Sequence, residues 1–308
     1  MKTTTLVLRS GMLAALVAHA LPGQTVAARP PVIDVHYHGP ATPPPALLHP
    51  DSLNVRYRVI ELNPTMLDAW QSVDRERFLP SLGLIFDHGR DLFGGALGMT
   101  TPTTFPDTSW LRREIKAGRV RAFGELIPAY AGMSPNDPRL EPYWSMAEEF
   151  DLPVGIHMGS GPPGAAYMTV PFKFPEYRAA YGDPMLLEEV LMHHKRLRLS
   201  VMHAGWPMLD QMVALLYAHP GVYVDVGVLQ QEKFVPRAAY YRHLRGLVEA
   251  GFGKRIMFGS DTPSGSLRVG IDAILAADFL SEQQKSDILC GNAMRFFRLP
   301  ESVCRPDP

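Results

Sequence analysis

The stretch Pro31-Val-Ile-Asp-Val-His-Tyr-His-Gly-Pro40 contains two histidines one residue apart at the end of an apolar run. Three of the four residues from Val32 to Val35 are β-branched and apolar, which predicts a short buried strand. Residues two apart on a strand point to the same face, so His36 and His38 would project together from its end. Gly39-Pro40 then ends the strand. This pair would form half of a divalent-metal site, although two hydrogen-bonded structural histidines would give the same pattern.

Seven further strand-like segments follow, and most are separated by a stretch with helical character. The expected strands begin near residues 32, 56, 79, 120, 153, 198, 222 and 255, and the third extends from Phe78 to Phe86. Strands that alternate with helices need crossover connections and therefore form a mostly parallel sheet. Eight such units in 308 residues predict a single-domain α/β fold, a (β/α)8 TIM-like barrel with one active-site mouth. A doubly wound open sheet is the alternative, but no glycine-rich phosphate loop follows the first strand.

Residues 1–28 have the layout of a secretory signal peptide. A short basic start with Lys2 and Arg9 precedes an apolar run at residues 11–18, which is too short to span a bilayer. Small residues around 18–20 or 26–28 offer alternative cleavage points. We therefore expect export to the bacterial periplasm or secretion, with residues 29–308 as the mature barrel. A disordered leader is the alternative interpretation.

The charge balance and the cysteines limit the partners and the compartment. Removal of residues 1–28 lowers the formal net charge from −1 to −3, because the leader has two basic residues and no acidic one. We therefore expect no nucleic-acid partner and no stable membrane anchor. Cys290 and Cys304 are the two thiols of the chain. In an exported protein they either form one disulfide between the tail and the last helix or stay unpaired.

Polar side chains fall at the ends of five of the expected strands. These candidates are His36, His38, Glu125, His157, His203 and Asp261. Each has an ordinary interpretation by itself, because an interior histidine can be hydrogen-bonded, a carboxylate can pair with an arginine, and an aspartate can cap a turn. In a barrel, however, the carboxyl ends of all strands meet at one mouth. The joint pattern therefore predicts a metal site.

These motifs resemble the amidohydrolase superfamily of metal-dependent barrel enzymes. The stretches at 123–128, 152–157, 203–207, 259–263 and 291–295 (Phe-Gly-Glu-Leu-Ile-Pro, Leu-Pro-Val-Gly-Ile-His, His-Ala-Gly-Trp-Pro, Gly-Ser-Asp-Thr-Pro and Gly-Asn-Ala-Met-Arg) are similar to its amidohydrolase-related branch. Aminocarboxymuconate semialdehyde decarboxylase and resorcylate decarboxylases belong to that branch. The likeness covers about residues 31–299, and it implies the fold and the site but no single substrate, because the branch contains hydrolases, hydratases and decarboxylases.

The resemblance also implies a role for each candidate. His36, His38 and His157 would bind the metal, and Asp261 would be a further ligand or the general base. His203 would polarise the substrate carbonyl or bind its carboxylate. Glu125 occupies the place where some members have a bridging carboxylate or a modified lysine, so the site would hold one or two ions. Nitrogen and carboxylate ligands suit zinc best, with manganese, iron or cobalt as alternatives.

Three functions are compatible with this site. The first is a metal-dependent hydrolase of a small amide, ester or lactone, in which Asp261 moves the proton of the attacking water and His203 stabilises charge on the substrate oxygen. The second is a decarboxylase of a small carboxylated substrate, which would need a cation in the mouth; Arg90, Arg178 and Arg268 follow strand ends in the sequence. The third is an exported, non-catalytic binding protein on the same barrel. In each case the partner is a small molecule, and a homo-oligomer is compatible with the sequence.

Overall fold

The computed structural model describes residues 29–48, 52–84, 86–87, 103–167 and 174–305. The expected leader at residues 1–28 and Arg90 lie outside these ranges. In the part of the chain that is described, no helix is long and apolar enough to cross a membrane.

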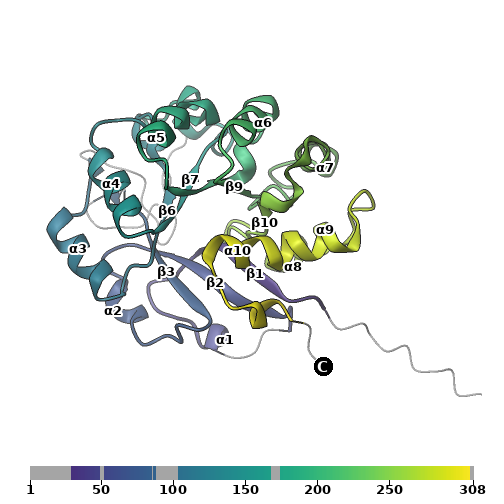
Figure 1. Cartoon of the computed structure of the whole chain (residues 1–308), viewed down its shortest axis with the longest axis horizontal. Coiled ribbons are helices and arrows are strands. Elements are labelled where there is room, and N and C mark those ends of the chain that lie inside the picture. The colour runs from purple at the N-terminus through teal and green to yellow at the C-terminus, as the bar shows by residue number, and fades with distance from the viewer. Residues whose placement is uncertain (1–28, 49–51, 85, 88–102, 168–173, 306–308) are drawn as a thin grey trace, which may run out of the picture.

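Eight parallel strands form one sheet in the order of the chain (Figure 1). They are β1 (Val32–His38), β2 (Val55–Leu62), β3 (Phe78–Leu82), β6 (Ala122–Leu126), β7 (Pro153–His157), β8 (Arg198–Met202), β9 (Val222–Asp225) and β10 (Ile256–Met257). Val35 donates its N–H to the carbonyl of Phe258 at 3.1 Å, and His38 donates its N–H to Thr262 at 2.9 Å. These bonds join β1 to the segment after β10. The sheet is therefore a (β/α)8 barrel, as predicted.

Ten α-helices lie on the outside of the sheet or extend its connections (Figure 1). They are α1 (Pro45–Leu48), α2 (Leu67–Trp70), α3 (Thr108–Lys116), α4 (Glu141–Glu149), α5 (Glu188–His193), α6 (Leu209–Ala218), α7 (Arg237–Leu247), α8 (Leu267–Leu275), α9 (Glu282–Ser286) and α10 (Asn292–Phe297). These are the α-helices of the residues that the structure describes. Local chemistry sets several of their ends: the Asp107 side chain accepts the N–H of Trp110 at the start of α3, and Gly118 after this helix has a φ of +68°.

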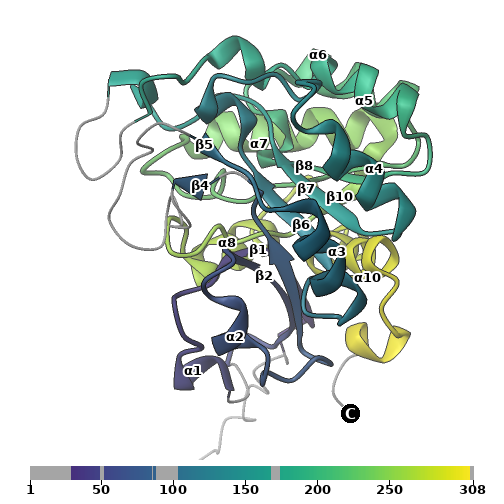
Figure 2. The same cartoon turned by 90° about the vertical axis from the view of Figure 1, so that its left-hand side faces the viewer.

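The third strand is shorter than the sequence suggests. β3 ends at Leu82, which is also the last residue in register with β2, opposite Leu62. Beyond Leu82 the chain has no further described residue in register with β2. Residues Phe86–Asp87 (β4) instead pair in antiparallel fashion with Thr103–Thr104 (β5), in a separate two-stranded sheet (Figure 2). The expected strand from Phe78 to Phe86 is therefore wrong in its second half.

Two apolar clusters hold the barrel together. The larger one lies between the strands and the surrounding helices. The smaller one, which we call the lower cluster, joins residues from the strands with three residues of the C-terminal segment: Ile33, Val35, Tyr57, Val59, Leu79, Ala122, Met257, Cys290, Ala293 and Phe296. α10 contacts β1 here, so the yellow C-terminal segment lies beside the purple first strand (Figure 1). The C-terminal helix thus covers the end of the barrel where the strands begin.

A disulfide joins the last helical segment to the tail. Cys290 and Cys304 are bonded, 14 residues apart in sequence, with their Cα atoms 5.8 Å apart. Of the two possibilities that the sequence left open, the structure has the bonded one.

Candidate metal centre

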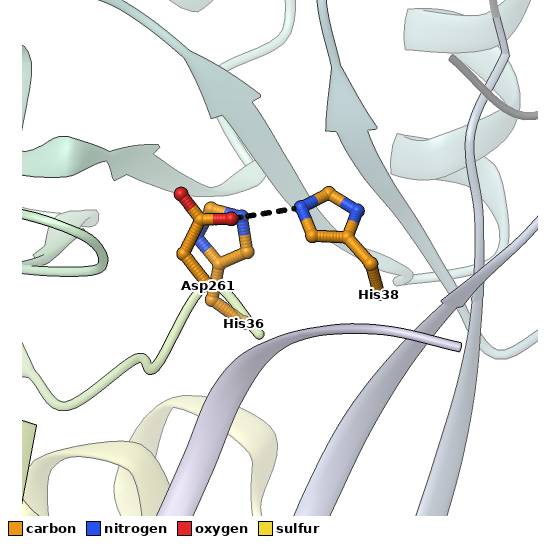
Figure 3. Close-up of side chains that lie close together, drawn as sticks. All are labelled: His36, His38 and Asp261. Carbon is orange, nitrogen blue, oxygen red and sulfur yellow. Dashed lines mark ion pairs between the residues drawn. The ribbon is translucent and has the colours of Figure 1, made fainter. Parts of the chain in front are cut away.

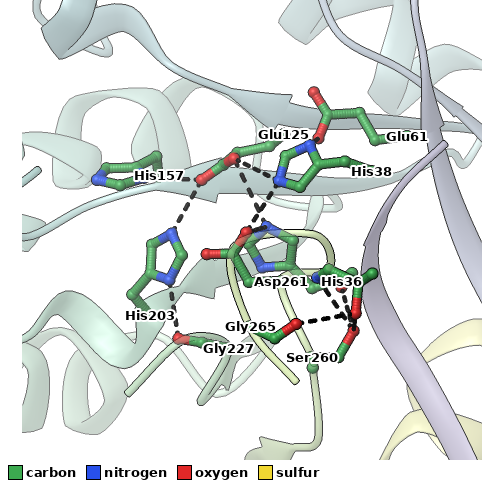
Figure 4. A network of polar contacts seen from close by, with 12 residues as sticks. His36, His38, Glu61, Glu125, His157, His203, Gly227, Ser260, Asp261 and Gly265 are labelled. Carbon is green, nitrogen blue, oxygen red and sulfur yellow. Dashed lines mark hydrogen bonds and ion pairs between the residues drawn. The ribbon is translucent and has the colours of Figure 1, made fainter. Parts of the chain in front are cut away.

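The six candidate residues meet at the carboxyl end of the barrel (Figure 4). β1 carries two histidines, β6 and β7 carry one residue each, one histidine follows β8 directly, and the aspartate lies four residues after the end of β10: His36, His38, Glu125, His157, His203 and Asp261. All six are at least 92% buried. Buried polar groups need partners, and here the partners are largely one another.

His36, His38 and Asp261 form a triad whose polar atoms face one point (Figure 3). The Nε2 atom of His38 lies 3.1 Å from Asp261 Oδ1, and Nε2 of His36 lies 4.0 Å from the same oxygen. Ligand atoms about 2.0–2.1 Å from a tetrahedral zinc ion are roughly 3.3 Å from one another. The observed separations bracket that value, so the triad has the spacing of a metal site.

Glu125 connects this triad to the other two histidines. Its Oε2 atom lies 3.5 Å from His36 Nε2 and 3.6 Å from His38 Nε2. Its Oε1 atom lies 2.7 Å from Nδ1 of His157 and 3.0 Å from Nε2 of His203. A second group with metal-ligand spacing is formed by His36, Glu125 and His203. One carboxylate therefore contacts four imidazoles, and its role as a metal ligand stays a prediction.

His157 stands apart from the groups with metal-ligand spacing in the described residues. Its Nδ1 atom contacts Glu125, whereas its buried Nε2 atom has no hydrogen-bond partner. The edge of Tyr130 packs against its ring, with the centroids 5.0 Å apart. Its role as a ligand remains a prediction.

Two further carboxylates orient the paired histidines. Asp225 Oδ1 lies 3.4 Å from Nδ1 of His36, and Glu61 Oε2 lies 2.7 Å from Nδ1 of His38. A carboxylate beside Nδ1 favours the tautomer with the proton on Nδ1, so in each ring Nε2 is the atom left to act as a ligand. The Nε2 atom of His36 is buried without a hydrogen-bond partner, and a bound metal ion would satisfy it. The donor set and its orientation therefore fit a divalent metal.

The candidates from the sequence include neither Glu61 nor Asp225. Asp225 also accepts the N–H groups of His203 at 3.4 Å and Gly227 at 2.8 Å, so it fixes two site residues together. Asp34 accepts the N–H and the hydroxyl of Ser260 and thereby holds the turn that precedes Asp261. A carboxylate next to the end of an expected strand was the available signal for Glu61.

Glycines allow the backbone to approach these side chains. Gly124, next to Glu125, has a φ of +141°, and a Cβ there would lie 2.9 Å from the carbonyl oxygen of Gly155. A Cβ on Gly259 would lie 2.7 Å from that of His36. Alanine at either position would displace a site residue.

The carboxylates shift the proton affinities of the paired histidines. Burial alone would lower the pKa of His36, but the charges of Asp225, Glu125 and Asp261 outweigh burial and raise the pKa well above its ordinary value. The pKa of His38 is also raised well above its ordinary value, because Glu61 and Asp261 outweigh the effect of burial. The carboxylates therefore favour positive charge at this point of the site.

His203 has a fixed ring orientation. Its Nδ1 atom lies 3.0 Å from the carbonyl oxygen of Gly227, which can only accept, so Nδ1 carries a proton. Its Nε2 atom faces Glu125 at 3.0 Å. Burial would lower the pKa of His203, but the hydrogen bond and charge of Glu125 raise it. His203 can therefore hold a proton at Nε2 and donate it toward the site.

A cavity of about 500 Å³ adjoins the centre, and Glu125, His157, His203 and Asp261 lie in its lining. This is the size of a pocket for a small molecule. Arg178, one of the three arginines that follow strand ends, donates to the backbone carbonyls of Pro175 and Tyr177 and is not in the lining. Arg268 lies exposed on α8 and is not in the lining either.

Comparison with known proteins agrees with this geometry. The family model described as amidohydrolase matches residues 33–299, and the chain belongs to this family. The resemblance to the amidohydrolase-related branch is thereby confirmed. A search of curated proteins found no match.

Solved structures with the same fold differ in their reactions. 5-Carboxyvanillate decarboxylase from Sphingomonas paucimobilis is 14% identical, with a TM-score of 0.55 over 89% of this chain and 100% of its own. A probable 2-pyrone-4,6-dicarboxylic acid hydrolase from Acinetobacter baumannii is 16% identical, with a TM-score of 0.55 over 87% of this chain and 99% of its own. Dihydroorotase from Campylobacter jejuni is 16% identical, with a TM-score of 0.55 over 88% of this chain and 84% of its own. At these identities the likeness extends to the fold alone.

Proposed function

We propose that this protein is a metal-dependent hydrolase of a small amide, ester or lactone. The observation that carries the proposal is the convergence of His36 Nε2, His38 Nε2, Glu125 Oε2 and Asp261 Oδ1 within 3.1–4.0 Å of one another across the four measured pairs. Two imidazole nitrogens and two carboxylate oxygens suit zinc, and manganese, iron or cobalt are alternatives. When bound, a divalent ion polarises a carbonyl and lowers the pKa of water toward neutrality.

The chain's own residues then supply the proton transfers. Asp261 is 8% exposed and lies in the cavity lining, so it can take the proton of the attacking water and pass it to the leaving group. His203 also lines the cavity and can donate from Nε2 to the substrate oxygen on which negative charge develops. Gly227 and Glu125 hold its ring in that orientation.

Decarboxylation is the second candidate, because the structural neighbours include such enzymes. A decarboxylase must hold a carboxylate, and a lysine or arginine is the usual partner for that group. Among the described residues, the cavity lining contains neither. This observation favours hydrolysis. A non-catalytic binding protein is the least favoured of the three, because loss of turnover would tolerate loss of one or more donors, and all are present.

Metal content and hydrolysis, measured on the same preparations, test this proposal. We expect one or two zinc or manganese ions per chain by elemental analysis and hydrolysis of at least one member of an ester, amide and lactone panel. His36→Ala and His157→Ala should lose metal and activity together, whereas His193→Ala, at an exposed histidine, should retain both. Wild-type protein that takes up no metal after reloading would refute the proposal, and release of carbon dioxide without hydrolysis would favour the decarboxylase.

We further propose that the protein is exported. The Cys290–Cys304 disulfide supports this proposal, because such bonds persist mainly in oxidising compartments. Amino-terminal sequencing of protein from expressing cells should give a start near residue 19–21 or 27–29. Full-length, reduced protein in the cytoplasm would contradict it.

A further inference from the structure

The cavity over the candidate centre has a polar floor and apolar walls. Its floor contains Glu125, His157, His203 and Asp261. One wall comes from the loop after β7, residues 160–167, with Tyr177 and Ala179. The facing wall comes from the segment after β9 and contains Val228, Leu229, Phe234 and Val235. Tyr130, Trp206 and Ser264 complete the lining.

These walls offer little to a charged group. Leu229 and Val235 are 2% and 3% exposed, so the inner part of this wall is firmly packed aliphatic surface. The only wall side chains with aliphatic hydroxyls, among the residues described, are Ser160 and Ser264. Lys233 lies beside the pocket, but its Nζ atom is held 4.8 Å from the ring centroid of Phe234, and it is not in the lining.

The charge distribution decides which substrates can enter. A carboxylate on the substrate away from the scissile carbonyl would leave water for a wall that provides no cation among the described residues, and burial of an unpaired charge is costly. An apolar or aromatic group would instead gain from contact with Leu229, Val235 and Tyr130.

We propose that the substrate is uncharged and carries an apolar or aromatic group next to its scissile carbonyl. This inference rests on the hydrolase function proposed above and narrows it. Residues of the β9 segment, with Leu229 at the centre, determine the specificity. The carbonyl lies over the polar floor, and the apolar group lies between the two walls.

A matched pair of esters tests the inference in the metal-loaded protein. p-Nitrophenyl pentanoate and the p-nitrophenyl monoester of glutaric acid have acyl chains of the same length, and the second ends in a carboxylate. The pair phenyl acetate and 4-acetoxybenzoate places the carboxylate on the leaving group instead. We expect kcat/KM to be about 100-fold higher for the uncharged member of at least one pair, because an unpaired buried charge is costly. Wild-type preference for the carboxylated member in both pairs would overturn the inference and leave the hydrolase function standing.

Substitutions in the wall sharpen the test. Leu229→Arg places a cation in the cavity and should raise relative activity on the carboxylated ester at least 10-fold, whereas the neutral control Leu229→Gln should not. Phe234→Arg, at a residue that is 36% exposed, provides the same test where folding is less sensitive. Lys233→Met should leave the wild-type preference unchanged. If it abolished activity on carboxylated esters, Lys233 would be their anchor and the inference would be wrong.

A binding measurement separates this inference from the hydrolase proposal. Hexanohydroxamic acid and its ω-carboxylated analogue present the same metal-binding group with and without a charge at the far end. Calorimetry should show tighter binding of the uncharged compound, even to protein that hydrolyses no ester in the panel. Tighter binding of the uncharged compound without turnover would refute the hydrolase but support the uncharged pocket. Equal or tighter binding of the charged compound would refute the pocket assignment.

Discussion

The carboxyl ends of the barrel strands bury histidines and carboxylates, whereas the lower cluster near their starts is formed by apolar side chains. β1 shows the change within one strand, because Ile33 and Val35 belong to the lower cluster and His36 and His38 belong to the metal centre. Burial of charged groups is costly, and burial of apolar surface is favourable. The apolar packing at the strand starts therefore stabilises a fold whose other end buries charged groups.

Substitutions at the two ends of the barrel should therefore differ in how they affect activity and stability. At the metal centre they should reduce activity more than stability. In the lower cluster they should reduce stability more than activity.

Asp261→Asn should give the largest effect. The amide has the shape of the carboxylate but cannot take a proton from water, so we expect kcat/KM to fall about 10³-fold, or about 4 kcal/mol. The unfolding free energy of the metal-free protein should change by less than about 1 kcal/mol. Steady-state kinetics and urea unfolding measure the two quantities. Asp272→Asn, on the exposed face of α8, is the matched control and should alter neither. A variant that loses stability in proportion to activity would contradict the division.

Phe296→Ala should have the next largest effect, on stability. Phe296 is 4% exposed in α10 and packs against Tyr223 and Phe297, with ring centroids 5.0 Å and 4.9 Å away. Truncation of a buried phenylalanine leaves a cavity, so we expect the unfolding free energy to fall by about 3–4 kcal/mol. At a temperature where the variant is folded, kcat should stay within about threefold of wild type. Tyr217→Ala, at an aromatic residue that is 85% exposed, controls for loss of an aromatic group.

The sequence was sufficient for the fold because the strands carry a strong local signal. Short β-branched runs such as Val32–Val35 begin the strands, and the alternation with helices then requires parallel crossovers. The six site candidates followed from the same reasoning, because a barrel brings all strand ends to one mouth. The end of β3 could not be foreseen, since it depends on where its neighbour β2 ends, at Leu62.

The orienting carboxylates were harder to predict because their role depends on ring atoms. Glu61 and Asp225 each face an Nδ1 atom, at 2.7 Å and 3.4 Å. No spacing in the sequence shows which nitrogen of His36 or His38 points inward. The apolar walls of the cavity were equally hidden, because Tyr130 and Leu229 come from different loops.

Removal of the disulfide should have a smaller effect than Phe296→Ala, at the same end of the barrel. The bond closes a loop of 14 residues in sequence, and a loop of that length corresponds to about 3 kcal/mol of stabilisation in the chain-entropy model. We expect the double variant Cys290→Ser/Cys304→Ser to unfold at lower urea concentration, with kcat unchanged at low temperature. Reduction of wild-type protein should reproduce the shift, and the double variant should not respond to the reductant. A loss of metal on reduction would show that the two ends are coupled.

Glu61→Gln should have the smallest effect, at the boundary between structure and chemistry. The amide oxygen can still accept a hydrogen bond from Nδ1 of His38. The ring therefore keeps its orientation but loses the neighbouring negative charge. We expect zinc affinity, measured by competition with a chromophoric chelator, to fall about 10-fold, and Glu61→Leu, which removes the acceptor as well, to lower it about 100-fold. Glu76→Gln, at an exposed glutamate, should bind zinc like wild type. If the leucine variant also bound like wild type, Glu61 would only pack against the ring. If zinc affinity instead falls in two steps, from wild type to Glu61→Gln to Glu61→Leu, the charge of Glu61 and its orientation of the ring contribute separately. The metal centre would then include a carboxylate that does not itself bind the metal.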